Sequence, residues 1–519
     1  MKKFDTKVTD NQDKTIQTET EEFYTIPERW KDVVLMTGEG RDERWIEDIE
    51  QLRDAIYRIH PIFNAIETIF IPRGLLENGE AGRLPWTDAK VNILRREAFN
   101  AELTKLIELV PKLIDMQIAF SIQHAIAILG DNHFNIFQQE GFPGSLGEAR
   151  LPVTFMYLGG VEGGYYLVET LETATDVLHQ RLVSVGGVSI EEVERRFADI
   201  WSLENIYNLR HNLSAYLSVQ VMLEYMGLMT GEKVDYVFEN EYTISISSAV
   251  DGELVDGRVP GEKPAFMNPL GNRYYLLGDG ILHVVMEKLV PNYQIALRSL
   301  TEEELADLER VREVVLSAGG VLRPVMNEDA TSIMDLWLGE EIHPELIELV
   351  ENNDITSVLI DVRNNDGGHD TTFFKVFDYL AEKVSENRRY FAVNSGSLSG
   401  SSAASLTAQA AGFTLIGEPT GQNTIFYGMQ TAPEDEFDFG SNLNNSKLYI
   451  GLLPNKLWHF EHAGFSSFFD LGYDIDEFAA THVNLEWYTS MPTTLISHTI
   501  EHWINNIDPI LEHIRVSSQ

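Results

Sequence analysis

The chain has 519 residues, 44% of them hydrophobic and 10% aromatic, so it can bury a large core and about two to four domains are expected. Its 81 acidic residues against 39 basic ones give a formal net charge of −42 at pH 7. Nucleic acid and anionic membrane surfaces would repel such a chain, so neither is expected as a partner. The sequence contains no cysteine, which excludes disulfides, thiolate metal sites and a cysteine nucleophile.

The start of the chain does not resemble a secretory signal, because no apolar stretch of about 7–15 residues follows its short basic beginning. No run of about 18 apolar residues occurs, so no membrane span is predicted. We therefore expect a cytoplasmic protein whose acidity belongs to its solvated surface.

Residues 1–40 are polar and weakly patterned, and we expect them to form a lead-in. Apolar residues then recur every three or four positions, which is typical of helices packed on one face. This pattern predicts three helices, at Trp45–Ile59, Ala98–Val110 and Ile118–Leu129. We therefore interpret residues 41–140 as a small helical domain.

Residues 141–262 combine short β-like segments with glycine turns, which predicts a mixed α+β module. The predicted strands are Leu151–Tyr157, Tyr165–Glu169, Arg181–Val185, Lys233–Phe238 and Thr243–Ser247. The predicted helices are Ile190–Ile200 and Leu213–Met226. A stretch with proline and glycine, Val259–Gly271, marks its end.

Residues 263–519 alternate between strands and helices, so the whole chain is expected to be a multidomain α/β protein. The predicted strands are short and β-branched, as in sheets covered on both faces: Tyr274–Leu277, Ile281–Met286, Val358–Val362, Tyr390–Val393 and Thr414–Ile416. The predicted helices are Glu302–Ser317, Thr371–Lys383 and Ser402–Ala411.

Six serines surround the turn between the strand at Tyr390–Val393 and the following helix: Ser395, Ser397, Ser399, Ser401, Ser402 and Ser405. A serine just before a helix lies beside free backbone N–H groups and the positive end of the helix dipole, which favour a developing oxyanion. The turn could therefore supply a nucleophilic hydroxyl. The alternative is that these serines only cap the helix and shape the turn.

Two more turns rich in small residues follow predicted strands. Asp361–Gly368 (DVRNNDGG) ends in a glycine pair that lets another backbone approach closely, and Gly417–Gly421 (GEPTG) follows the last strand. Loops after the carboxyl ends of parallel strands gather in one crevice. We therefore expect the three turns to form one site.

These motifs, in this order and spacing, resemble the tail-specific (C-terminal-processing) serine peptidase family, which includes the tricorn protease core. Upstream, WIEDIEQLRDAIYRIHP, a helix ending in LGDNH, and RLVSVGGVSIEEV extend the resemblance to roughly residues 45–519. It implies an N-terminal helical domain, a PDZ-like β module and a C-terminal α/β core of the ClpP/crotonase type. It also implies a polypeptide substrate and no cofactor, and leaves a homo-oligomer open.

The resemblance also implies site residues. The family's nucleophile precedes a small residue, and the matching residue here is Ser399, followed by Gly400. The family's oxyanion hole uses the amide after the nucleophile and a glycine of the DxRxNxGG turn, which implies Gly400 with Gly367 or Gly368. Ser402, in the segment GSSAA, loosely matches the nucleophile elbow of α/β-hydrolases and is the alternative nucleophile.

The base is a departure from the commonest family pattern. Many members use a lysine shortly after the GEPT turn, but the matching residue here is Asn423, which cannot deprotonate a hydroxyl, and Lys447 lies too far along the chain. Another branch uses histidine with a glutamate, which His133 (GDNHF) and Glu461 (FEHAG) resemble in position. An imidazole titrates near neutrality and contributes roughly 10²–10⁴-fold in rate, and an acid fixes its tautomer.

Metal catalysis is weakly supported. His459 and His462 flank Glu461, and His498 and His502 are four positions apart, but none forms the H-E-x-x-H order. We expect structural or solvated histidines and no metal.

The leading hypothesis is a serine endopeptidase in which the module presents or gates an extended polypeptide. One alternative, suggested by Asn423, is a catalytically silent peptide-binding protein on the same fold. The other is a small-molecule esterase that uses Ser402.

Overall fold

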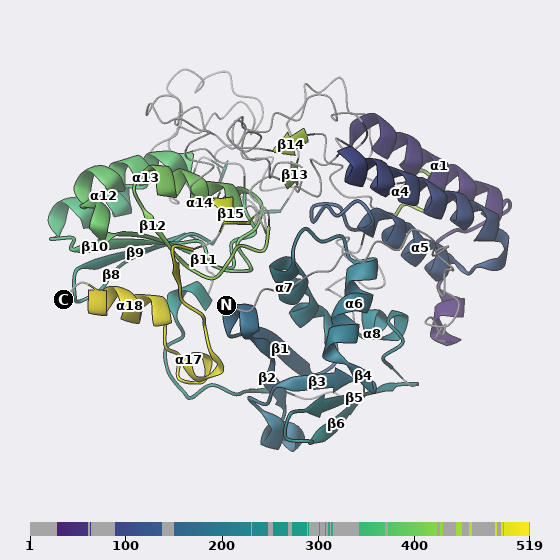
Figure 1. Ribbon diagram of the computed structural model, residues 1–519, viewed down its shortest axis with the longest axis horizontal. Helices are drawn as coiled ribbons and strands as arrows, with labels where there is room; N and C mark the ends of the chain where they lie inside the picture. The colour runs from purple at the N-terminus through teal and green to yellow at the C-terminus, as the bar shows by residue number, and fades with distance from the viewer. Residues whose placement is uncertain are drawn as a thin grey trace.

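The computed structural model contains three groups of elements that follow the chain from the helices on one side to an α/β core on the other (Figure 1). The structure describes residues 28–60, 63, 89–136, 150–229, 231–247, 253–267, 272–287, 289, 300–301, 307, 310–311, 313–314, 342–368, 372–422, 426–428, 443–448, 456–458, 483–484, 489–490 and 492–517. The predicted helix at Glu302–Ser317 lies largely outside these residues.

The first group is helical, as predicted. Its elements are η1 (Glu28–Asp32), α1 (Arg41–Ile59), α4 (Ala89–Leu109), η3 (Val110–Lys112) and α5 (Asp115–Ala127). The apolar stripe of α1 is fully buried, with Trp45, Ile49, Leu52 and Ile56 all inaccessible to solvent. The hydrophobic face therefore determines how this helix packs.

The module contains two small antiparallel sheets. The first has the order β1-β2-β7, and the second has the order β4-β3-β5-β6. The strands are β1 (Val153–Leu158), β2 (Gly164–Leu171), β3 (Leu182–Val185), β4 (Val188–Ser189), β5 (Lys233–Phe238), β6 (Thr243–Ser247) and β7 (Leu254–Asp256). The helices are η5 (Gly160–Glu162), η6 (Glu172–Val177), α6 (Ile190–Ile200), α7 (Ile206–Tyr216) and α8 (Gln220–Tyr225). A PDZ-like fold for this module stays a prediction.

One predicted helix of the module, Leu213–Met226, is wrong. The chain forms α7 and α8 with a break between them, because the carbonyl of Ser218 accepts a hydrogen bond from Leu151 N–H (2.7 Å) and Val219 bridges to Arg150. A backbone that pairs with another strand cannot continue an α-helical hydrogen-bond ladder at the same residues. The pairing fastens α7 beside β1.

The core is built on a six-stranded sheet of order β17-β12-β11-β10-β9-β8. Its strands are β8 (Arg273–Leu276), β9 (Ile281–Val285), β10 (Ser357–Asp361), β11 (Arg389–Val393), β12 (Thr414–Gly417) and β17 (Thr494–Leu495). All neighbours are parallel except the β8–β9 hairpin. The carboxyl ends of β10, β11 and β12 therefore share one edge of the sheet.

Helices cover both faces of this sheet (Figure 1). Side chains on one face, including Val358, Ile360 and Phe391, pack against α12 (Pro344–Asn352), α13 (Thr372–Lys383) and α14 (Gly400–Ala410). The opposite face packs against α18 (Pro509–Ser517). The remaining described elements are η7 (Ala265–Met267), η9 (Glu386–Arg388), β13 (Phe426–Gly428), β14 (Lys456–Trp458), β15 (Val483–Asn484), β16 (Thr489–Ser490) and α17 (Ile500–Ile504).

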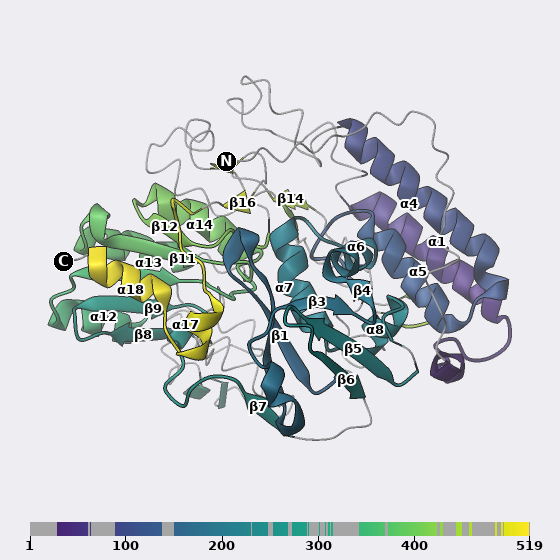
Figure 2. The same cartoon turned by 60° about the horizontal axis from the view of Figure 1, so that its bottom comes forward.

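The helical group and the module share one continuous cluster of buried apolar side chains. Figure 2 shows the two groups side by side, with α7 facing the core. The boundary predicted near residue 140 lies outside the described residues and stays a prediction. The other predicted domain limits stay predictions.

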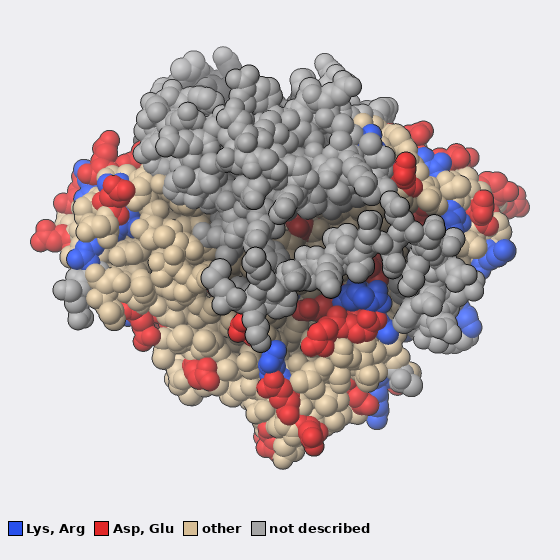
Figure 3. Space-filling view, viewed as in Figure 1, with Lys and Arg blue, Asp and Glu red and all other residues tan. Residues whose placement is uncertain are grey.

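Figure 3 shows Asp and Glu side chains spread over all three groups of elements on the face in view. Among the described helices, none has the length and apolar character needed to cross a membrane.

Candidate active site

Three turns meet at the carboxyl edge of the core sheet, as the sequence predicts. The turn after β10 contacts the serine turn through Asn365, whose carbonyl accepts hydrogen bonds from Leu398 N–H (2.9 Å) and Ser401 Oγ (2.7 Å). The GEPTG turn is joined to the end of β11 by Glu418 N–H and the carbonyl of Val393 (3.0 Å). The sheet therefore sets the relative positions of the three motifs.

Ser399 is the N-cap residue of α14 and has φ 51° and ψ −124°. A side-chain-bearing residue rarely adopts this conformation, which costs on the order of 1–3 kcal/mol. A sharp strand-to-helix turn of this kind exposes a serine hydroxyl above the sheet, as in a nucleophile elbow. The sequence motif of a nucleophile elbow matches Ser402 loosely, whereas the residue with the strained conformation is Ser399.

Most of the other serines in the cluster donate hydrogen bonds from their hydroxyls to backbone carbonyls. Ser397 Oγ donates to the Val362 carbonyl (2.8 Å), and Ser405 Oγ donates to the Ser402 carbonyl (2.6 Å). Ser402 itself is buried and donates to the Gln422 carbonyl (2.8 Å). These hydroxyls hold the turn together, so the alternative structural role applies to them.

The glycine pair lies directly against Ser399. A Cβ on Gly367 would come within 2.5 Å of Ser399 Cβ, and a Cβ on Gly400 would come within 2.2 Å of the Gly368 carbonyl oxygen. Gly367 also has φ +99°, which side-chain-bearing residues rarely adopt. Glycine is therefore required at these positions for the two turns to touch.

Two of the three candidate oxyanion amides remain available among the described residues. Gly367 N–H donates to Asn365 Oδ1 (2.7 Å), so its proton is already used. Gly400 N–H belongs to the first turn of α14, where helical amides lack an intrahelical acceptor. Gly400 with Gly368 is thus the better pair for binding an oxyanion.

His133 lies in the loop after α5, and buried polar contacts hold this loop. Asp131 N–H donates to Ser202 Oγ (2.7 Å), and Asp131 Oδ1 accepts from His133 N–H (3.0 Å). Asp131 Oδ2 lies 3.2 Å from His60 Nε2 at the end of α1. The helical group and the module together therefore fix the histidine loop.

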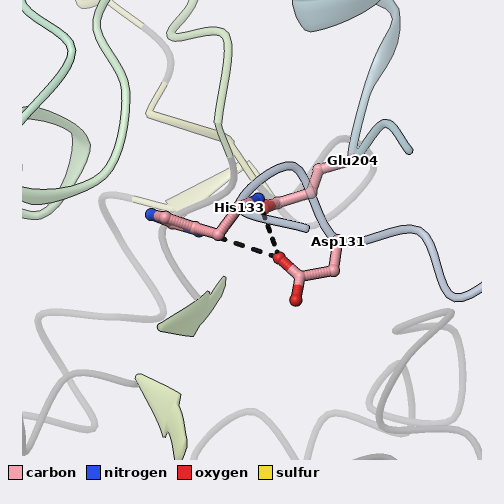
Figure 4. Close-up of side chains that lie close together, drawn as sticks. All are labelled: Asp131, His133 and Glu204. Atoms are coloured by element: carbon pink, nitrogen blue, oxygen red, sulfur yellow. Dashed lines mark hydrogen bonds and ion pairs between the residues drawn. The ribbon is translucent and has the colours of Figure 1, made fainter. Parts of the chain in front are cut away.

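Asp131 is fully buried and stays ionised. Burial alone would raise the pKa of its carboxyl, but hydrogen bonds and charge interactions with His133 and His60 outweigh burial and hold the pKa below its ordinary value. Figure 4 shows its carboxylate directed at His133. The Asp131 Oδ1 atom lies 3.7 Å from His133 Nδ1, beyond hydrogen-bond distance.

The structure brings His133 and Ser399 together although 266 positions separate them in the chain. His133 Nε2 lies 3.0 Å from Ser399 Oγ, within hydrogen-bond distance. The imidazole side chain is 26% exposed, so it is accessible from solvent. This pair has the contact that a nucleophile and its base require.

Sequence reasoning missed two residues next to the pair. Gln422 Nε2 lies 3.2 Å from His133 Nδ1 and 2.5 Å from Glu204 Oε1, and Gln422 Oε1 accepts from Ser399 N–H. Gln422 directly follows the GEPTG motif and could have been suspected from it, whereas nothing in the sequence marks Glu204.

Asp131, His133 and Glu204 could in principle hold a cation, since one ligand atom from each lies within 4.8 Å of the others (Figure 4). The amide nitrogen of Gln422 already lies against two of these ligand atoms. An N–H donor in that position is incompatible with a bound cation, so the residues fit a hydrogen-bonded cluster better.

Several predicted residues lie outside the described part of the chain or away from the site. Asn423, Glu461, His459 and His462 are outside the described residues. Lys447 Nζ donates to the Asn444 carbonyl (2.6 Å), in a segment that binds α1.

His498 and His502 stack on each other with ring centroids 6.1 Å apart, and His502 Nδ1 accepts from Thr499 N–H. Burial, together with the charge of Arg363, lowers the pKa of His498 to about 4, so the ring is neutral near pH 7. The contacts of these two histidines are thus with each other and with the start of α17.

A cavity of about 280 Å³ lies between β1, α7 and the turns of the core, and Asn364, Ser395 and Glu418 are among the residues that line it. Glu418 accepts a hydrogen bond from His498 N–H (3.1 Å) and bonds to Ser497. Burial raises the pKa of Glu418 to about 7, despite these hydrogen bonds and the charge of Arg363. Residues of the module and residues of the three turns, such as Met156 and Ser395, therefore line the same cavity.

No family model and no curated relative matches the chain. Among solved structures, mature CPAF complexed with lactacystin matches at 9% identity and a TM-score of 0.47, covering 92% of this chain and 98% of that one. The photosystem II D1 C-terminal processing protease matches at 10% identity and a TM-score of 0.31, over 93% of this chain and 98% of that one. Tricorn protease matches at 10% identity and a TM-score of 0.33, over 92% of this chain and 37% of that one.

The last two structures carry the names of peptidases that the motifs resemble. At this level of likeness, the geometry of the site has to carry any argument about function.

Proposed function

We propose that this chain is a serine peptidase that cleaves polypeptides, with Ser399 as nucleophile and His133 as base. The observation that carries the proposal is the 3.0 Å separation of His133 Nε2 and Ser399 Oγ, two residues that are 266 positions apart in the chain. Ser399 has the strained conformation of a nucleophile at a strand-to-helix turn, and this favours it over Ser402. Glu461, the orienting acid that the family resemblance implies, lies outside the described residues and stays a prediction.

The chemistry follows from these positions. His133 Nε2 takes the hydroxyl proton as Ser399 Oγ attacks the peptide carbonyl carbon, and the carbonyl oxygen becomes an oxyanion bound by the Gly400 and Gly368 amides. When the C–N bond breaks, the imidazolium returns the proton to the leaving amine. A water molecule then repeats the sequence on the acyl-enzyme and releases the acid product.

Strand β1 offers an extended polypeptide an edge to pair with. Strand β1 lies at one edge of its sheet and lines the cavity that Asn364 and Ser395 also line. An edge strand offers unpaired backbone groups to an incoming chain, so a peptide can add to the sheet while its side chains enter the cavity. The module would then present the substrate, as the sequence predicts.

The test replaces Ser399 with alanine. Ser399→Ala should abolish both hydrolysis of unfolded casein and labelling by a fluorophosphonate, because it removes the hydroxyl that lies 3.0 Å from His133 Nε2. Ser402→Ala is the matched control and should keep both activities, since Ser402 Oγ is buried against Gln422. Activity retained in Ser399→Ala, or ester hydrolysis lost only in Ser402→Ala, would contradict the proposal.

A catalytically silent peptide-binding protein is the second candidate, and Asn423 in the usual place of the family's lysine is the observation that favours it. It predicts that the wild-type protein is not labelled by a fluorophosphonate. It also predicts that peptide binding, measured by fluorescence anisotropy, is the same in wild type and Ser399→Ala.

A further inference from the structure

The side-chain amide of Gln422 lies between the two groups of the proposed catalytic pair. It is fully buried, and its Oε1 accepts a hydrogen bond from the backbone N–H of Ser399. Its Nε2 lies 2.5 Å from Glu204 Oε1 and 3.2 Å from His133 Nδ1. One residue therefore contacts the nucleophile, the base and a carboxylate at the same time.

Two of these contacts fix which end of the amide faces His133. The Ser399 N–H can only donate, so it requires the Gln422 oxygen, and an ionised Glu204 can only accept, so it requires the Gln422 nitrogen. The flipped amide would place its NH₂ group against the Ser399 N–H, which is also a donor. It would place its oxygen against the Glu204 carboxylate, which is also an acceptor. The Gln422 NH₂ group must therefore face His133 Nδ1.

This orientation determines the tautomer of His133. An amide NH₂ group has no acceptor lone pair, so Nδ1 has to accept its hydrogen bond. A neutral imidazole that accepts at Nδ1 carries its proton on Nε2. His133 Nε2–H then donates to Ser399 Oγ, and in this state the ring cannot take the serine proton.

Catalysis requires the other tautomer, with the proton on Nδ1 bound to an acceptor. Asp131 Oδ1 lies 3.7 Å from Nδ1, but it already accepts from His133 N–H, and its partner oxygen contacts His60. Glu204 belongs to the same cluster, with a carboxylate oxygen within 4.8 Å of the histidine's ligand atom. Gln422 therefore competes with His133 for the Glu204 carboxylate.

We infer that Gln422 is a positioning residue that holds the site in a resting state, and that the Glu204 carboxylate accepts a hydrogen bond from His133 Nδ1–H when Gln422 withdraws. This inference rests on the proposed function. In the shift, the ring gives its Nε2 proton to solvent water and takes one from solvent water at Nδ1, since the side chain is 26% exposed, so the charge of the site is unchanged. A substrate carbonyl that accepts the Ser399 N–H would remove the contact that holds Gln422 Oε1.

The direct test is the tautomer of His133, read from ¹⁵N NMR of protein labelled at histidine, at about pH 8, where imidazole is neutral. His133→Gln identifies the resonances. The wild type should carry the proton on Nε2 and Gln422→Met on Nδ1, because methionine keeps the length and removes the donors. A wild type protonated on Nδ1 would overturn the inference. This readout needs no catalysis, so it is separable from failure of the proposed function.

The second test is the rate of fluorophosphonate labelling. Gln422→Met should be labelled about tenfold faster than wild type, the factor expected from one hydrogen bond. Gln422→Glu keeps an acceptor for Ser399 N–H and offers one to Nδ1–H, so it should also be labelled faster than wild type. This second variant keeps the test valid if Gln422→Met does not fold. Gln180→Met, a half-buried glutamine of the module, is the matched control and should equal wild type.

The role of Glu204 is tested by adding Glu204→Gln to Gln422→Met. The double variant should lose the gain, because no carboxylate of Glu204 remains for Nδ1–H. Slower labelling of both Gln422→Met and Gln422→Glu would show that Gln422 only supports the site and would overturn the inference. A double variant that keeps the gain would overturn the role of Glu204.

Discussion

Ser399 is held by residues near it in the chain, whereas His133 is held by residues from distant segments. The serine turn is joined to the turn after β10 by bonds that span no more than 36 positions, such as Ser401 Oγ to the Asn365 carbonyl. The histidine loop depends on His60 and Ser202, each 71 positions from Asp131. The half of the proposed site that holds Ser399 thus depends on the turns of the core, and the half that holds His133 depends on how the helical group and the module pack.

Because different contacts hold Ser399 and His133, we expect substitutions near the two residues to impair the site in different ways. A change in the serine turn should distort the site locally, whereas a change around His133 should act through the packing of the module. The predictions below test this difference, starting with the largest effect.

The largest effect is expected when the base is removed without disturbing its loop. His133→Gln should lower kcat/KM for a peptide substrate by roughly 10²–10⁴-fold, the usual contribution of a positioned general base. Its thermal unfolding should match wild type, because Asp131 and Ser202 still hold the loop backbone. His513→Gln, on α18 at the far side of the core, is the control. Equal losses of kcat/KM in His133→Gln and His513→Gln would show that His133 is not the base.

A smaller loss is expected from crowding the nucleophile turn. Gly367→Ala would place a Cβ 2.5 Å from Ser399 Cβ at a residue with φ +99°, so the turn must shift. A cost on the order of 1–3 kcal/mol corresponds to about a 5- to 150-fold fall in kcat/KM if the shift moves Ser399 away from His133. Gly278→Ala meets nothing within 4 Å and should leave activity unchanged. An active Gly367→Ala variant would show that close packing of the two turns is dispensable.

The smallest effect concerns Glu418, which accepts a hydrogen bond from His498 N–H beside the cavity. Burial raises its pKa from 4.5 to about 7, so the folded protein binds an extra proton between these values. Its contribution to stability is present below about pH 4.5 and is lost as pH rises through about 7.

Glu418→Gln should remove this dependence. The free energy of unfolding of the variant, measured by urea denaturation and relative to wild type, should rise with pH by at most about 1.4 kcal/mol per unit between pH 4.5 and 7. Glu172→Gln, at an exposed carboxylate of the module, should parallel wild type. Parallel curves for Glu418→Gln would show that Glu418 titrates alike in the folded and unfolded chain.

Local patterns predicted most of the secondary structure that can be compared. The apolar stripe of α1 and the short β-branched strands β10, β11 and β12 lie where the sequence indicates, because periodicity and turn glycines act over a few residues. The helix predicted over Leu213–Met226 was wrong because its break depends on pairing with Leu151, which helical periodicity does not record.

The sequence by itself determined the three turns, the glycines that let them touch and the group of serines among which Ser399 lies. These features depend on backbone conformation, which neighbouring residues dictate. Only the tertiary structure decided that His133 reaches Ser399, and that Gln422 and Glu204 lie beside them. Those contacts arise where the helical group and the module pack against the core, and sequence spacing carries no information about that packing.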